Sequence, residues 1–291
     1  MHRYLLSLAC LCILTACSGE SQTPAASSTN DSPEGAVKTM LESFGGNDVA
    51  AIFAVAAPET QAMARAEYEA MQAAETTPEE QAQFDGTLSM LTAEGAEGTL
   101  LAMAKPQLAE AQQGVAMMAA MLPMMAGQAI AEQDLTPEEQ QQSMAMLTAL
   151  SGWLAGLDVT DEAKLEEAIG VLCTTARDLK FSNHAEMKAM DFDTMLGEAG
   201  KGLKGFKEVL KIYGVDVDAT LKSVDVGSPE IDGDTAKVPY SITIMGEQHD
   251  AMVEVEKIDG KWYLAAKDNA SDLDIPVGEF ENGPGGIDPM P

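Results

Sequence analysis

Residues 224–264 alternate between hydrophobic and polar side chains, which is the period of a β-strand with one buried face. The hydrophobic positions are Ala236, Val238, Tyr240, Ile242, Ile244, Ala251, Val253, Val255, Trp262 and Leu264. Turn signals divide the stretch at Gly233-Asp234, Gly246-Glu247 and Asp259-Gly260. The pattern predicts an antiparallel meander of about four strands that opens at about Thr220 to Val226. Pro239 has no N–H to donate, so we expect an edge or a bulge beside it.

The chain upstream of this meander shows helical periodicity. Ser32-Pro33-Glu34 combines a capping hydroxyl, a proline and an acid, so it predicts a helix start, and Gly45-Gly46 predicts its end. Asn47 or Asp48 can cap a second helix, which we expect to end at Pro58.

From residue 59 to about 180 no strand pattern occurs, and Thr77-Pro78-Glu79-Glu80 and Thr136-Pro137-Glu138-Glu139 are both capping boxes. Apolar stripes predict helices that pack on one another. The first is Met144, Leu147, Leu150, Leu154 and Leu157; the second is Leu165, Ile169, Leu172, Ala176 and Leu179, bordered by Cys173; the third is Met195, Leu196, Ala199, Leu203, Phe206, Leu210 and Tyr213. The fold class that follows is α+β: a curved antiparallel meander packed against N-terminal helices, with a helix-rich insertion.

The N-terminus has the most specific motif. A short basic start and an apolar run from Leu5 to Leu14, too short to span a bilayer, end in Leu14-Thr15-Ala16-Cys17. This resembles the lipobox of bacterial lipoproteins, which implies cleavage after residue 16 and acylation of Cys17. Cys10 fits less well, because Ser7 occupies its −3 position; an ordinary secretory signal with an incidental cysteine is the other alternative. By analogy with lipoprotein sorting in enteric bacteria, Ser18 favours the outer membrane, facing the periplasm.

The net charge and the cysteine count of the chain exclude some classes of partner and of cross-link. The formal net charge is −30, which excludes nucleic acid and anionic lipid surfaces as favourable partners because both would be repelled. A lipid bilayer engaged through acylated Cys17 and another envelope protein remain compatible. After cleavage at the lipobox, Cys173 is the only cysteine that is not acylated, so no intramolecular disulfide is possible, and we expect a buried, inert thiol.

Met117, Met118, Met121, Met124 and Met125 form a cluster between Ala111 and Ala131, where no residue is charged. The simplest interpretation is core packing. Two alternatives are an apolar binding surface made by Met117, Met121, Met124 and Met125, and a Cu(I) site, since thioethers bind soft metals. We expect Pro123 to interrupt the helix. Gln112, Gln113 and Gln128 make the segment too polar to span a membrane.

Catalytic motifs are sparse. His184 and His249 are the histidines that follow the signal segment, and neither belongs to a metal-binding or nucleophile motif. No cofactor is predicted, and no catalytic residue or metal ligand is assigned. Asp191-Phe192-Asp193 and Asp216-Val217-Asp218 lack the rest of a calcium loop, so solvated charge is expected.

The opening Ser32-Pro33-Glu34-Gly35-Ala36-Val37, with Phe44 and Gly46-Asn47-Asp48, resembles the first helix of small bacterial lipoproteins of the nuclear transport factor 2-like superfamily. The hairpin segments 233–238 and 259–264 resemble the end of their sheet. The resemblance implies a cone of helices on a curved sheet around a pocket, which Tyr240 and Tyr263 could face. The superfamily includes isomerases that pair a pocket Asp with a Tyr.

These observations predict a signal peptide at 1–16, a tether at 17–31, an α+β domain made of 32–58 and 204–266, a helical insertion at 59–203 and a disordered acidic tail at 267–291. The predicted function is a lipid-anchored envelope protein with a non-catalytic binding or scaffolding role. A small-ligand carrier or isomerase-like enzyme and a Met-rich helical binder of apolar partners are the alternatives.

Overall fold

The computed structural model describes residues 30–132 and 137–265. The predicted signal peptide with Cys10 and Cys17, most of the predicted tether, the predicted acidic tail and the predicted cap at Thr136 lie outside the described residues. The predictions on those segments therefore stay predictions.

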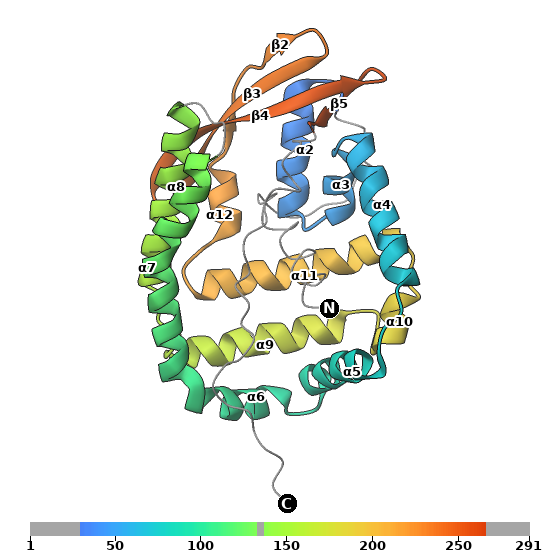
Figure 1. The fold of residues 1–291 in the computed structure, drawn as a ribbon, viewed down its shortest axis with the longest axis vertical. Coiled ribbons are helices and arrows are strands. Elements are labelled where there is room, and N and C mark those ends of the chain that lie inside the picture. Colours follow the sequence, from blue (N-terminus) through green and yellow to red (C-terminus); the bar gives the residue numbers. More distant parts are fainter. Residues whose placement is uncertain (1–29, 133–136, 266–291) are drawn as a thin grey trace, which may run out of the picture.

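Helices make up most of the described chain, and they are arranged in layers beneath a sheet (Figure 1). Their bounds are α2 Pro33–Gly45, α3 Val49–Ala54, α4 Pro58–Ala73, α5 Pro78–Thr92, α6 Ala96–Ala104, the 3-10 turn η1 Lys105–Gln107, α7 Leu108–Glu132, α8 Pro137–Ala155, α9 Glu162–Asp178, α10 His184–Lys188, α11 Phe192–Ile212 and α12 Val217–Lys222. Two predicted caps are confirmed. The Ser32 hydroxyl accepts the Gly35 N–H at 3.1 Å, and Thr77 forms a capping box with Glu80.

The sheet is antiparallel and follows the N-terminal helices, as predicted. Its strands are β1 Asp225–Val226, β2 Glu230–Asp232, β3 Thr235–Ile244, β4 Glu247–Ile258 and β5 Lys261–Leu264. β3 lies between β4 on one side and both β1 and β2 on the other, so β1 and β2 form one interrupted edge. The interruption faces Pro239, whose carbonyl accepts the Gly227 N–H at 2.8 Å. The missing N–H of Pro239 therefore points to the break in the edge strand, which agrees with the prediction of an edge or a bulge beside this proline.

Tight turns join β3 to β4 and β4 to β5. Met245 and Gly246 both have positive φ, as do Asp259 and Gly260. Two consecutive residues with positive φ are typical of the type I′ hairpin, whose twist matches that of the strands.

One face of the sheet is covered by α2, α11 and α12. Ala36 and Val37 of α2 pack against Val238, Val255 and Trp262. Phe44, Leu203, Leu221 and Ile242 form the adjoining cluster, and Leu41 contacts both. The first helix and the last strands therefore share one core. α11 runs continuously across residues 203 and 204, so the expected boundary between domain and insertion falls inside a helix.

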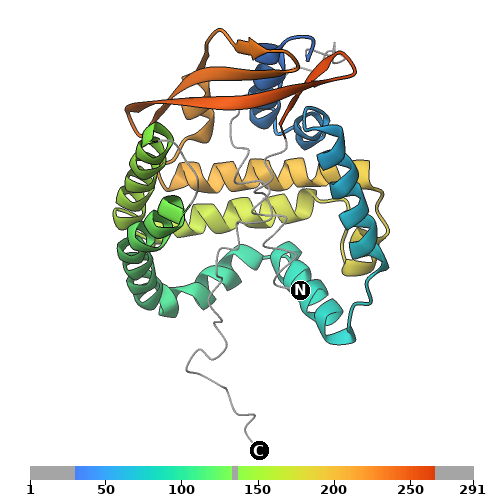
Figure 2. The same cartoon turned by 45° about the horizontal axis from the view of Figure 1, so that its top comes forward.

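Below α11 lies α9, which packs on α5 and α6 through a cluster of Ala96, Ile169 and Cys173 (Figure 2). Cys173 is fully buried, and burial raises the pKa of its thiol. The close packing of α9 on α11 depends on Gly205, because a Cβ built there would lie 2.2 Å from Thr175 Oγ1.

A buried lysine connects α11 to the end of α2. Lys207 Nζ donates to the carbonyls of Phe44 and Gly45 at 3.2 and 3.3 Å, and it pairs with Asp218 at 2.6 Å. This cation stabilises the negative end of the α2 dipole where the helix stops.

Three sequence predictions are wrong in detail. Thr220 is helical, because Asp216 accepts the Ala219 N–H at 2.9 Å and caps α12 ahead of the first strand. The second helix ends at Ala54, and Pro58 begins α4 instead of ending α3. The predicted stripes are also rotated: Leu172 is 48% exposed while its neighbour Cys173 is buried, and Phe206 is 47% exposed beside the buried Lys207.

Candidate binding surface on the methionine-rich helix

α7 and α8 form an antiparallel hairpin along one side of the molecule, between the bottom helices and the sheet (Figures 1 and 2). A stripe of buried or half-buried residues three or four apart runs along α7, namely Leu108, Gln112, Val115, Ala119, Leu122 and Ala126. The Ala119 carbonyl of this stripe bonds to Ser151 of α8, and Gln112 bonds to Leu157 just after α8. Alternating spacings of three and four are the seam of a two-helix coiled coil. Because α8 lies between α7 and the sheet, α7 is the outer helix of the pair.

Polar side chains fasten the hairpin at its base and along α8. Gln112 donates to the Leu157 carbonyl at 3.0 Å and accepts the Val159 N–H at 2.9 Å. The Trp153 indole N–H donates to the Tyr213 carbonyl at 3.1 Å, which joins α8 to the end of α11. The hairpin is therefore anchored through its seam and through α8.

Pro123 lies inside α7, and the helix continues through it from Leu108 to Glu132, contrary to the predicted interruption. A proline leaves the carbonyl four residues earlier, that of Ala119, without its helical donor. The Ser151 hydroxyl of α8 donates to that carbonyl at 2.9 Å. The bond freed by the proline is thus replaced by one across the hairpin, which explains why the helix tolerates Pro123.

Met117, Met118, Met121, Met124 and Met125, together called the Met face, have side chains that are 43–69% exposed. At about 100° of rotation per residue, these five positions cover an arc of about 120° that points away from the seam. Large apolar side chains gathered on one exposed helix face are typical of an interaction surface. The interpretation of this cluster as core packing is therefore wrong, and a surface made by Met117, Met121, Met124 and Met125 agrees with their exposure.

The Met face lies in a segment of α7 that carries no charge, from residue 111 to residue 131. Glu110 precedes the segment and is exposed, and Glu132 ends the helix. No helix of the described chain is long and apolar enough to cross a membrane. The Met face is therefore an uncharged apolar strip that a partner could cover without burying an ion.

The two tyrosines expected at one pocket lie on opposite faces of the sheet. Tyr240 is on the inner face, where it packs with the Phe44 and Ile242 cluster. Tyr263 pairs with Glu256, and Glu256 pairs with Thr235, so all three belong to the outer face. The structure does not bring the tyrosines together, because successive side chains of a strand point to opposite faces and the strand register places Tyr240 and Tyr263 on different faces.

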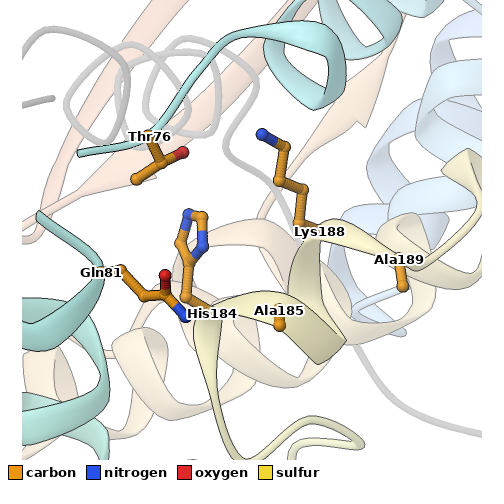
Figure 3. A pocket seen from close by; sticks show the side chains of 6 residues that line it. All are labelled: Thr76, Gln81, His184, Ala185, Lys188 and Ala189. Atoms are coloured by element: carbon orange, nitrogen blue, oxygen red, sulfur yellow. The ribbon is translucent and has the colours of Figure 1, made fainter. Parts of the chain in front are cut away.

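A cavity of about 390 Å³ lies elsewhere, where the start of α10 meets the segment between α4 and α5. Thr76, Gln81, His184, Ala185, Lys188 and Ala189 line it, and in Figure 3 the Thr76, His184 and Lys188 side chains point toward the same space. The His184 N–H donates to Asp85 at 2.6 Å, and its ring packs edge-on against Phe84. Lys188 donates to the Ala74 carbonyl. Sequence reasoning missed this cavity, because its residues come from two separate segments with no common motif.

Neither histidine belongs to a catalytic pair within the described residues. No hydrogen bond joins the His184 ring to a carboxylate or a hydroxyl there, and the buried Nε2 of His249 has no hydrogen-bond partner. The two Asp-x-Asp motifs are used in helix caps and ion pairs: Asp191 accepts the Thr194 N–H, and Asp193 pairs with Arg65 at 3.1 Å. In residues 30–132 and 137–265 no three His, Cys, Asp or Glu side chains are grouped so that they could hold a metal ion.

Comparison with protein-family models, curated proteins and solved structures finds no match to this chain. The proposals below therefore rest on its own residues.

Proposed function

We propose that this chain is a lipid-anchored, non-catalytic protein of the bacterial envelope that binds an apolar segment of another envelope protein on the Met face. The observation that carries the proposal is the exposure of five methionines on one uncharged helix face. Flexible thioether side chains adapt to differently shaped apolar partners, which is why such surfaces suit a binding role.

The anchor in this proposal is acylated Cys17, supported by the apolar run and the Leu14-Thr15-Ala16-Cys17 motif. Anchoring places the Met face near other envelope proteins while the acidic surface keeps the chain away from anionic headgroups. The resemblance to the nuclear transport factor 2-like superfamily belongs to the same proposal, and the curved antiparallel sheet after N-terminal helices is compatible with it.

The carrier or isomerase alternative required a pocket with a tyrosine and a shielded carboxylate. Tyr240 and Tyr263 do not meet, and no carboxylate lines the cavity beside His184. The exposed Met face therefore favours binding of a partner over that alternative.

The size of the expected interaction follows from the exposure. Burying a whole methionine side chain contributes about 2 kcal/mol, so covering five half-exposed ones contributes about 5 kcal/mol before the costs of association. This suits a partner that adds its own contacts or is held close by a shared membrane.

The binding test uses an uncharged amphipathic peptide of about 22 residues, with Leu on one face and Gln and Ser on the other, titrated calorimetrically into the full chain. We expect binding that weakens at least 10-fold when Met117, Met121, Met124 and Met125 are replaced by Gln. The control replaces four exposed methionines elsewhere, Met63, Met71, Met245 and Met252, and should leave the affinity unchanged. Absence of binding, or equal losses in both variants, contradicts the proposal.

The anchoring test is metabolic labelling with palmitate. We expect the wild-type chain to be labelled and Cys17→Ser to be unlabelled, whereas Cys10→Ser should be labelled as well as wild type. An unlabelled wild-type chain contradicts the anchor.

A further inference from the structure

The cavity beside His184 is a cleft between two segments that are distant in the sequence. It has a volume of about 390 Å³ and lies between the connection from α4 to α5 and the short helix α10 (Figure 3). His184 and Lys188 come from α10, one turn apart, while Thr76 and Gln81 come from the facing segment. The fold thus brings four polar side chains to one cleft.

The imidazole of His184 is the buried part of this cleft. The residue is only 6% exposed, and within the described part of the chain its ring makes no hydrogen bond. Its backbone N–H donates to Asp85 at 2.6 Å, and the Phe84 ring packs edge-on against the imidazole with 5.6 Å between centroids. Phe181 in turn packs on Phe84. The ring is therefore held by the backbone and by aromatic contacts, and its polar edge is left for a ligand.

Lys188 supplies the positive charge of the cleft. Of the described residues that line it, Lys188 alone carries a formal positive charge, and none is a carboxylate. Its ammonium donates one hydrogen bond to the Ala74 carbonyl, which fixes the side chain and leaves its other N–H groups for a ligand. Thr76 adds a hydroxyl and Gln81 an amide. The cleft is therefore rich in donors, which suits a ligand rich in acceptors.

The acids that are nearest to these residues in sequence are used in helix caps. Glu80 accepts the backbone N–H and the hydroxyl of Thr77, both at 2.9 Å. Glu186 accepts the same two groups of Ser182 at 2.7 and 2.8 Å. Their charges, that of Asp85 and the formal net charge of −30 oppose a multiply charged anion more than a singly charged one. One lysine in this field therefore suits a monoanion better than a phosphate.

We infer that the cleft binds the carboxylate of a small aliphatic acid, which accepts hydrogen bonds from His184 and Lys188. A carboxylate has two acceptor oxygens and one negative charge, so it matches an imidazole N–H together with an ammonium. Ala185 and Ala189 line the cleft one turn apart and offer their methyl groups to the aliphatic chain. A volume of about 390 Å³ is near the lower end for small-molecule sites, so the acid is short.

This inference goes beyond the proposed function and does not depend on it, because no residue of the Met face lines the cleft. The test titrates sodium hexanoate into the full chain and follows the imidazole signals of His184 by proton–nitrogen NMR, assigned with His184→Gln. We expect these signals to shift to saturation with a Kd on the order of 1 mM, while the ring signals of His249, on β4, stay in place. Hexanamide, which has the same size without the charge, should bind about 10-fold more weakly.

Two variants with matched controls locate the site. Gln81→Glu places a carboxylate in the cleft and Lys188→Met removes its cation, so each should weaken hexanoate binding about 10-fold. Gln83→Glu on α5 and Lys38→Met on α2 change the net charge equally at exposed positions outside the cleft, and should leave the affinity unchanged. Gln81 is exposed, so Gln81→Glu should fold as wild type does and tests the cleft even where Lys188→Met is unstable.

An unshifted His184 signal at about 50 mM hexanoate overturns the inference. Equal affinity for hexanamide and hexanoate overturns it too, because the cation would then have no part in binding. Equal losses in Gln81→Glu and Gln83→Glu would show that the field of the whole chain is the cause. Tighter binding of inorganic phosphate would assign another anion, and tighter binding of acetyl-dialanine would assign a peptide carboxyl terminus; either result overturns the assignment to a small aliphatic acid.

Discussion

Replacing Glu198 gives the sharpest test of how α9 and α11 are joined. The Glu198 side chain is 2% exposed and comes from α11. Its Oε2 accepts the backbone N–H of Lys180 at 2.8 Å and the Lys201 ammonium at 2.9 Å, and Lys180 Nζ lies 3.7 Å from Oε1. Lys201 also donates to the Asp178 carbonyl at 2.6 Å, at the end of α9. One carboxylate thus organises the contact between the two helices.

The magnitude follows from what remains after Glu198→Ala. The two lysines are 34% and 69% exposed at their side chains, so water can solvate them. The Lys180 N–H loses its acceptor, and a charge-assisted hydrogen bond disappears. Each of these losses costs about 1–2 kcal/mol, so we expect the free energy of unfolding to fall by about 2–4 kcal/mol.

The same carboxylate makes stability depend on pH. Burial raises the pKa of Glu198, but hydrogen bonds from Lys201 and the Lys180 amide, with the charges of both lysines, outweigh burial and hold the pKa below the ordinary 4.5. A carboxyl whose pKa is lower in the folded state stabilises above its unfolded pKa. That stabilisation is lost as pH falls from 4.5 through the folded pKa.

The assay is urea unfolding of wild type, Glu198→Ala and Glu198→Gln at pH 7 and at pH 3.5. The control is Glu208→Gln, an exposed glutamate on the same helix whose ion pair spans 3.9 Å, which should change stability by less than about 0.5 kcal/mol. We expect the difference in the free energy of unfolding between wild type and Glu198→Gln to be smaller at pH 3.5 than at pH 7. A loss below about 0.5 kcal/mol for Glu198→Ala, or a gap independent of pH, refutes the reasoning.

Three further changes test other contacts by urea unfolding. Ser151→Ala should lower the free energy of unfolding by about 1 kcal/mol in wild type. In a Pro123→Ala background the loss should be clearly smaller, because residue 123 then donates its own N–H to the Ala119 carbonyl; equal losses in the two backgrounds would show that the two residues are not linked. Lys207→Met should cost about 2 kcal/mol, because buried carbonyls and a carboxylate lose their donor; an unchanged midpoint would contradict its role at the end of α2. Gly205→Ala should cost about 1–3 kcal/mol, and Thr175→Ala should relieve part of it; no relief would mean that the clash is not with that side chain.

The helix starts and the strands could be predicted because their causes are local. A capping hydroxyl and a proline act on the next turn, as Ser32 does, and alternation decides which face of β3 is buried, as Val238 and Ile242 show. The rotation of the inner helices could not be predicted in this way. α9 is covered from several sides, so an apolar stripe alone does not decide whether Leu172 or Cys173 is buried.

The candidate site depended on a contact between distant segments. From the sequence alone, Pro123 predicts a broken helix, and the methionines around it fit a core as well as a surface. The outcome turns on whether a second helix supplies a donor to the Ala119 carbonyl, which Ser151 does from 32 residues away. Once α7 is continuous and packs on α8 along one face, the methionines of the opposite face are exposed.

The acidic charge and the Met face are physically connected. An uncharged apolar strip about 30 Å long would favour self-association in a neutral protein. Here two copies that approach through their Met faces bring formal charges of −30 together, and this repulsion opposes self-association without any charge on the strip itself. The same field attracts a basic partner, so the charge that opposes self-association would also favour a basic segment on the Met face. This preference should weaken with salt while the apolar contact persists, since screening acts on the charges and leaves the burial of the thioethers unchanged.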